Sequence, residues 1–164
     1  MYPVDERLKV KAGLPANKDA AGLIPAARIE KAQQIIEKSS DLMNAEFGRI
    51  MKEMTALYNG MTISKSMNHD DVRANQLSVS KMRHRARNIR EMTETYNQSL
   101  VYDISKELYS FCRVMNSERV ESYTILKGYL DTLNISYARK LSDRNSPAAL
   151  ELKRIINKAV SQYA

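Results

Sequence analysis

The sequence has few of the residues that cross-link or interrupt a chain. One cysteine, Cys112, is present in 164 residues, so no internal disulfide can form, and we expect a reducing, cytoplasmic setting. Four prolines and five glycines are too few for the many turns of a β-sandwich or barrel. No apolar run approaches the roughly 18 residues of a membrane span, and MYPVDERLKVKAG at the start lacks the apolar segment of a signal peptide.

Residues for independent catalysis and for cofactor binding are also scarce. The sequence contains no glycine-rich phosphate loop and no Glu-x-x-His pair, and its two histidines are His69 and His84. These absences disfavour a nucleotide site, a di-iron site and most other metal sites. Cys112 falls on the apolar face of a predicted helix, which is typical of a small buried side chain and not of a nucleophile. We expect no cofactor, no metal and no independent enzymatic activity.

What the sequence does have is helical spacing of apolar residues over most of its length. We predict helices over about 25–59, 70–97, 99–115, 118–141 and 146–163, separated by Asn59-Gly60, Asn116-Ser117 and similar breaks. Asn68 or Asp70, Ser99 and Ser146 are candidate N-caps. The first helix has one apolar stripe over about eight turns, made of Ile29, Ala32, Ile36, Met43, Phe47, Ile50, Met54 and Leu57.

Four substantial amphipathic helices joined by short links indicate an all-α fold, an antiparallel four-helix bundle. We place the bundle domain at 24–164, with a short last helix that closes one end. Residues 1–23 contain Pro3, Gly13, Pro15 and Gly22 and show no sustained apolar period, so we predict an extended N-terminal arm.

The charge is concentrated most strongly in one segment of the second predicted helix. The formal net charge is +7, and Lys81–Arg90 contains five basic residues and one histidine. At about 100° per residue, Arg83, Arg87 and Arg90 fall within roughly 60° of one another. His84 lies about 60° beyond Arg87, away from the predicted core. The segment therefore predicts a three-arginine stripe that faces solvent.

This stripe has more than one interpretation. It is either a solvated face, with Arg90 paired to Glu94, or a docking surface for an acidic or phosphorylated partner, which the planar fork of arginine suits. A third interpretation is a nucleic-acid surface. Nucleic acid would be expected to recruit more of the molecule, and the aromatic residues fall mainly on core stripes, so stacking platforms are not evident.

Several segments resemble the histidine-containing phosphotransfer (HPt) proteins of alphaproteobacteria. These proteins are four-helix bundles that pass a phosphoryl group between receiver domains in two-component signalling. The similar segments are Leu8-Lys9-Val10-Lys11, Ile29-Glu30-Lys31-Ala32, Ala86-Arg87-Asn88-Ile89-Arg90-Glu91, Tyr96, Ser99-Leu100-Val101 and Phe111-Cys112-Arg113.

The departures from the family pattern remove its chemistry. The resemblance places the phosphoacceptor histidine at Arg87, the phosphate-neutralising lysine at Arg90 and a small glycine at Glu91. Guanidinium is cationic at physiological pH and has no nucleophilic lone pair, so phosphoacceptor activity is not carried over. The resemblance implies a degenerate member that binds a response-regulator receiver domain or a histidine kinase without accepting phosphate. The expected partner-binding residues are Arg83, His84, Arg87, Arg90 and Glu91.

Three alternatives stay open at this stage. His84 could act as a displaced phosphoacceptor, which would make the chain an active phosphorelay protein. The basic helix could bind nucleic acid, or the chain could be a structural subunit whose basic face is only solvated. No membrane partner is expected, and an oligomer is possible.

Overall fold

The computed structural model describes residues 25–95, 98–138 and 143–163. Within these residues the chain forms α-helices and no strand, which confirms the predicted all-α class. The predicted arm, residues 1–23, lies outside them, as do Tyr96 and Leu141. No described helix is long and apolar enough to cross a membrane. The helices are α2 (Ala26–Asn59), α3 (His69–Thr95), α4 (Ser99–Val114), α5 (Val120–Ala138) and α6 (Pro147–Tyr163).

Short polar side chains begin two of these helices where the sequence predicts caps. The side chain of Asn68 accepts a hydrogen bond from the Asp71 backbone N–H at 2.8 Å, and the Asp71 carboxylate accepts from the Asn68 N–H at 3.2 Å. This reciprocal pair satisfies two backbone donors at the start of α3. At α6, the Ser146 hydroxyl accepts from the backbone N–H of Ala149 at 3.1 Å, directly before Pro147.

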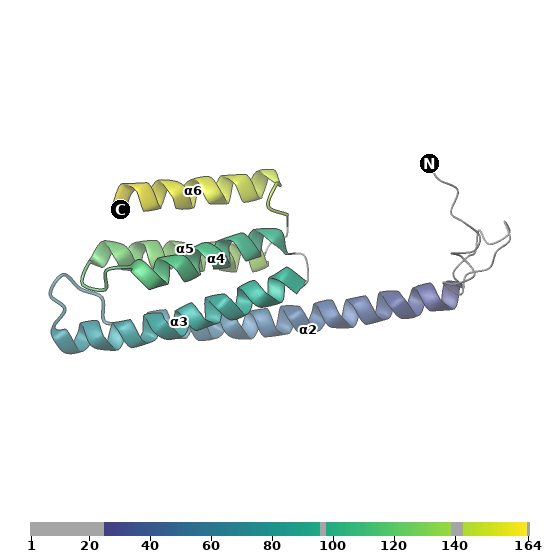
Figure 1. Ribbon diagram of the computed structural model, residues 1–164, viewed down its shortest axis with the longest axis horizontal. Coiled ribbons are helices and arrows are strands. Elements are labelled where there is room, and N and C mark those ends of the chain that lie inside the picture. Colours follow the sequence, from purple (N-terminus) through teal and green to yellow (C-terminus); the bar gives the residue numbers. More distant parts are fainter. Residues whose placement is uncertain (1–24, 96–97, 139–142, 164) are drawn as a thin grey trace. The chain divides into compact units, whose positions relative to one another are not determined.

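Contacts divide the chain into two compact units, Met1–Leu42 and Met43–Ala164, so that α2 contributes to both. In the second unit, successive helices run in opposite directions (Figure 1). Their inward faces form one apolar core. Removal of this apolar surface from water is the main stabilising term. Side chains with no exposed surface include Met54, Met82, Ala86, Ile89, Leu100, Leu108, Leu126 and Leu133.

The predicted stripe of the first helix is buried only from Met43 onward. Ile29 is 44% exposed and Ile36 is 67% exposed, and Ala32 is exposed as well. The expectation that the whole stripe faces a core is therefore wrong for this part of the helix. Burial of the stripe begins at Met43, the first residue of the second unit, where the apolar core lies.

A buried polar network joins the loop before α3 to α5. Asn75 is 1% exposed, and its amide donates to the Thr62 carbonyl at 2.7 Å and accepts from the Thr62 N–H at 3.1 Å. The same amide nitrogen donates to the Tyr123 hydroxyl at 3.1 Å, and that hydroxyl donates to the Ser117 carbonyl at 2.6 Å. Each buried group thus has a partner, which makes the network stabilising and specific.

We expect Asn75→Ala to lower the free energy of unfolding by about 2–3 kcal/mol, because it leaves the backbone groups of Thr62 and the Tyr123 hydroxyl without this partner. Denaturant unfolding followed by circular dichroism measures the change. Gln76→Ala, at the exposed neighbouring position, is the control and should change stability by less than about 0.5 kcal/mol. Equal losses in the two variants would contradict the assigned role of the network.

Candidate binding surface

The basic segment of α3 is held in a fixed orientation by the core. Met82, Ala86 and Ile89 have no exposed surface, so this side of α3 faces inward along about two turns. Side chains between these positions must project outward or toward the neighbouring helices. His84 and Arg87 are exposed, while Arg83, Arg85 and Arg90 are half-buried.

Arg87 is the arginine that faces solvent. Its side chain is 56% exposed, and its Nε donates to the carboxylate of Glu91 at 3.0 Å. The Glu91 side chain is similarly exposed, so solvent screens the pair and its net contribution is small. A guanidinium carries five N–H donors, and this pair uses the Nε–H. The Nη groups remain in position to donate to an incoming carboxylate or phosphate.

Arg90 is turned toward α4 and not fully toward solvent. Its guanidinium carbon lies over the ring of Tyr109, 5.2 Å from the ring centroid. This geometry is a cation–π contact, which holds the guanidinium in place without neutralising its charge. The expected Arg90–Glu94 pair is not among the ion pairs of the described residues, and the exposed i,i+4 pair in this part of α3 is instead Arg87–Glu91.

Arg83 is half-buried, and it lies close enough to Cys112 of α4 for its charge to act on that thiol. Its positive charge lowers the pKa of the thiol, but burial has the larger effect and raises that pKa to about 12. The predicted ridge of three solvent-facing arginines is therefore wrong in detail. Arg87 is exposed, while Arg83 and Arg90 lie at the seam between α3 and α4.

Arg85 has a separate, structural position. Its Nε lies 2.7 Å from the carboxylate of Glu53 on α2, on another side of α3 from the exposed Arg87. The pair links two neighbouring helices of the second unit. We therefore leave Arg85 out of the binding surface.

The seam places α4 residues that the sequence-based prediction missed beside these arginines. Lys106 and Arg113 lie about one turn before and after Tyr109, and both are exposed. Their spacing of three and four residues was the available signal, but it pointed to a surface only once α4 was known to pack beside α3. We call this surface the α3–α4 basic face, made of Arg83, Arg87, Arg90, Lys106, Tyr109 and Arg113.

The remaining predicted residues lie at the edge of this face. His84 is exposed on α3, three residues before Arg87. Glu91 is paired with Arg87 and places one negative charge beside the arginines. His69 is exposed at the first residue of α3, next to the Asn68 cap. Within the described residues, no group of three or more His, Cys, Asp or Glu side chains is arranged to hold a metal ion.

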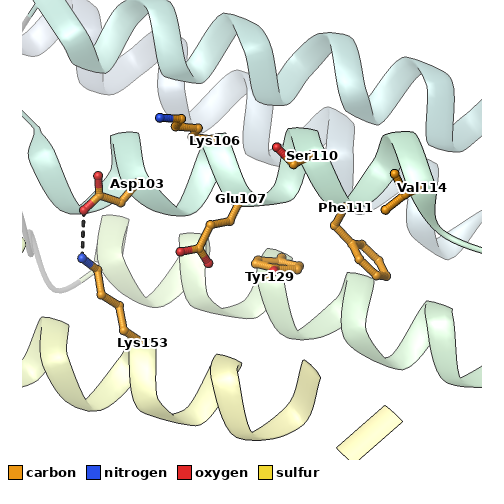
Figure 2. A pocket seen from close by; sticks show the side chains of 8 residues that line it. All are labelled: Asp103, Lys106, Glu107, Ser110, Phe111, Val114, Tyr129 and Lys153. Atoms are coloured by element: carbon orange, nitrogen blue, oxygen red, sulfur yellow. Dashed lines mark hydrogen bonds and ion pairs between the residues drawn. The ribbon is translucent and has the colours of Figure 1, made fainter. Parts of the chain in front are cut away.

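A groove of about 650 Å³ lies against α4, α5 and α6, and Lys106 of the α3–α4 basic face is among the residues that line it (Figure 2). Asp103 lies 2.8 Å from Lys153 and 3.1 Å from Arg144, so it joins α4 to α6 and to the residues just before that helix. Burial raises the pKa of the Glu107 carboxyl and that of Tyr129, the latter to about 12. Because Asp103 is already paired with Lys153 and Arg144, we assign the groove to helix packing and not to ligand binding.

Comparison with protein-family models, curated proteins and solved structures finds no match for this chain.

We expect the Cys112 thiol to react with Ellman's reagent at least about 100-fold more slowly than a thiol at Ser110→Cys, an exposed position on the same helix. Burial both blocks the thiol and suppresses its reactive thiolate form. Absorbance during the reaction at pH 8 measures both rates, with the Ser110→Cys variant made on a Cys112→Ala background. Comparable rates would contradict the buried position.

The same pKa shift predicts a pH dependence of stability. The native pKa of Cys112, about 12, is above the ordinary value of 9.0, so the native state holds this proton more tightly than the unfolded state. The contribution of this bound proton to the free energy of unfolding is fully present below pH 9 and is lost as the pH rises toward 12. Cys112→Ala should therefore show a smaller loss of unfolding free energy over this range than the unchanged protein, and parallel curves would contradict the prediction.

Proposed function

We propose that this protein is an HPt-like four-helix bundle that binds the acidic phosphorylation pocket of a response-regulator receiver domain without accepting its phosphoryl group. The observation that carries the proposal is the exposed guanidinium of Arg87, at the position where the resemblance expects the phosphoacceptor histidine. The side chain is 56% exposed, and the buried neighbours Ala86 and Ile89 keep its backbone position fixed on the outer side of α3.

The chemistry of Arg87 suits binding of an anionic group and does not suit transfer of a phosphoryl group. A guanidinium can donate two parallel hydrogen bonds to a carboxylate or phosphate, but it has no lone pair that could attack phosphorus. Its present partner, Glu91, is an exposed carboxylate held by one 3.0 Å hydrogen bond. Exchange of this weak pair for a more enclosed carboxylate or phosphate of a partner costs little.

The rest of the α3–α4 basic face supports the same interpretation. Tyr109 holds the Arg90 guanidinium at the seam, and a positioned side chain loses less conformational freedom on binding than a mobile one. Lys106 and Arg113 extend the positive charge along α4. A predominantly positive surface, formed by two helices, complements an acidic pocket and accelerates association with it.

The test uses the full chain and a panel of purified receiver domains, each with and without beryllofluoride as a phosphoryl analogue. We expect Arg87→Glu/Arg90→Glu to weaken binding at least about 30-fold, because two attractive contacts become repulsive. Arg87→Lys keeps the positive charge but loses the planar guanidinium with its two parallel hydrogen bonds, so it should weaken binding only several-fold. Isothermal titration calorimetry measures the affinities.

Lys158→Glu, at an exposed position on α6, is the matched control for the charge reversals and should bind like the unchanged chain. The proposal fails if no receiver domain binds, or if the Arg87→Glu/Arg90→Glu variant and this control bind equally well. Circular dichroism should show the same helix content in all variants.

The rival function, phosphotransfer through His84, rests on the exposure of that histidine on the same helix. Incubation with a receiver domain carrying a radiolabelled phosphoryl group should leave this chain unlabelled. An acid-labile label that is present on the unchanged chain and absent from His84→Ala would overturn the non-catalytic assignment. A complex with nucleic acid that weakens steeply with salt would instead favour the nucleic-acid alternative.

A further inference from the structure

The first half of α2 has an apolar face that the described residues leave exposed. Ile35 is 58% exposed, Ile36 67% and Leu42 71%, and Ile29 is 44% exposed. At about 100° per residue, these side chains fall on one side of the helix, together with Ala32, Ser39 and, in the first turn, Arg28. The face runs over residues 26–42, about 25 Å of helix at 1.5 Å per residue.

This face continues a pattern that is buried farther along the same helix. Ile29, Ile36 and Met43 follow one another at seven-residue intervals, and the interval continues to Ile50 and Leu57. Met43 and Ile50 are 8% and 2% exposed, so the stripe is built for contact with another helix. A seven-residue repeat is the spacing at which two helices keep one face in contact.

We propose that residues 26–42 of α2 pair with the same segment of a second copy of this chain, in parallel and in register. The two apolar faces would cover each other over about five turns. The surface area that the two segments would bury is on the order of that of a small, reversible protein–protein interface. A helix of this length without tertiary packing is marginal in water, so pairing would also stabilise the segment.

The charges beside the face favour a second copy in the parallel direction. Lys31 and Lys38 lie beside the edge formed by Ile35 and Leu42. Glu30 and Glu37 lie beside the opposite edge, about 100° from Ile29 and Ile36. A parallel pair brings the lysine edge of one copy toward the glutamate edge of the other, whereas an antiparallel pair places the two lysine edges together.

The same charges disfavour an anionic membrane as the occupant. A helix that lies on such a membrane carries basic residues at both edges of its apolar face. Here one edge carries the two glutamates, which the lipid head groups would repel. The mixed signs suit a protein helix with the same arrangement, and the helix itself provides one.

The test measures the mass of the full chain by analytical ultracentrifugation between about 1 and 300 μM. We expect a reversible dimer, and we expect Ile36→Glu/Leu42→Glu to raise its dissociation constant at least about tenfold, because the substituted carboxylates lose hydration in the interface. Leu77→Glu is the control, since Leu77 is a 63% exposed apolar residue on α3. It should leave the dimer unchanged.

The direction of pairing is tested by cross-linking. In a parallel, in-register pair, Ile29→Cys meets its own copy and should form an intermolecular disulfide under mild oxidation. In an antiparallel pair centred on Ile36, position 29 would lie opposite position 43. Cys112 is buried and contributes little background, which a Cys112→Ala variant removes altogether.

Several results would overturn the proposal. They are a monomer at all concentrations, a dimer that survives Ile36→Glu/Leu42→Glu, or a dimer whose Ile29→Cys thiols do not cross-link. A monomer that sediments with phosphatidylserine vesicles, and loses this binding in the Ile36→Glu/Leu42→Glu variant, would assign the face to lipid instead. None of these outcomes depends on receiver binding, which the Arg87→Glu/Arg90→Glu variant tests separately.

Discussion

The candidate binding surface depends on the burial of one side of α3. Met82, Ala86 and Ile89 have no contact with solvent, and each is separated from the next by about one turn. The free energy of removing these side chains from water sets the rotation of the helix about its axis. A rotation large enough to bury Arg87 would expose this row and place a charge in the core, which is far more costly. The position of the arginines on the molecule is therefore a consequence of core packing.

The packing of α4 then divides the arginines into different roles. The guanidinium carbon of Arg90 lies 5.2 Å from the centroid of the Tyr109 ring, and the buried Cys112 lies near Arg83. Arg87 has no α4 aromatic beneath it and extends into solvent, where only the exposed carboxylate of Glu91 accepts from it among the described residues. Arginines at a seam are positioned and partly desolvated, while an exposed arginine is available to a partner. A binding surface benefits from both, because positioned charges raise affinity and exposed charges steer the encounter.

The two ends of α2 show how one pattern can have two outcomes. The seven-residue spacing continues from Ile29 to Leu57, but Met43 and Ile50 are buried within the second unit while Ile36 is 67% exposed. The stripe is a chemical property of the helix, and burial is a property of what surrounds it. An exposed continuation of a buried stripe is therefore a natural place to look for an intermolecular contact.

The sequence by itself determined the helical class, most helix boundaries and the caps at Asn68 and Ser146, because these depend on residues close together in the chain. It also identified Arg87 and His84 as outward positions, since the apolar period of α3 sets its inner side. It did not identify Tyr109, Lys106 or Arg113 as neighbours of that surface, nor Asn75 as a buried amide, nor the end of burial at Met43. These features were decided by the tertiary structure alone, because each depends on which helix packs beside another and for how many turns, and no local spacing contains that information.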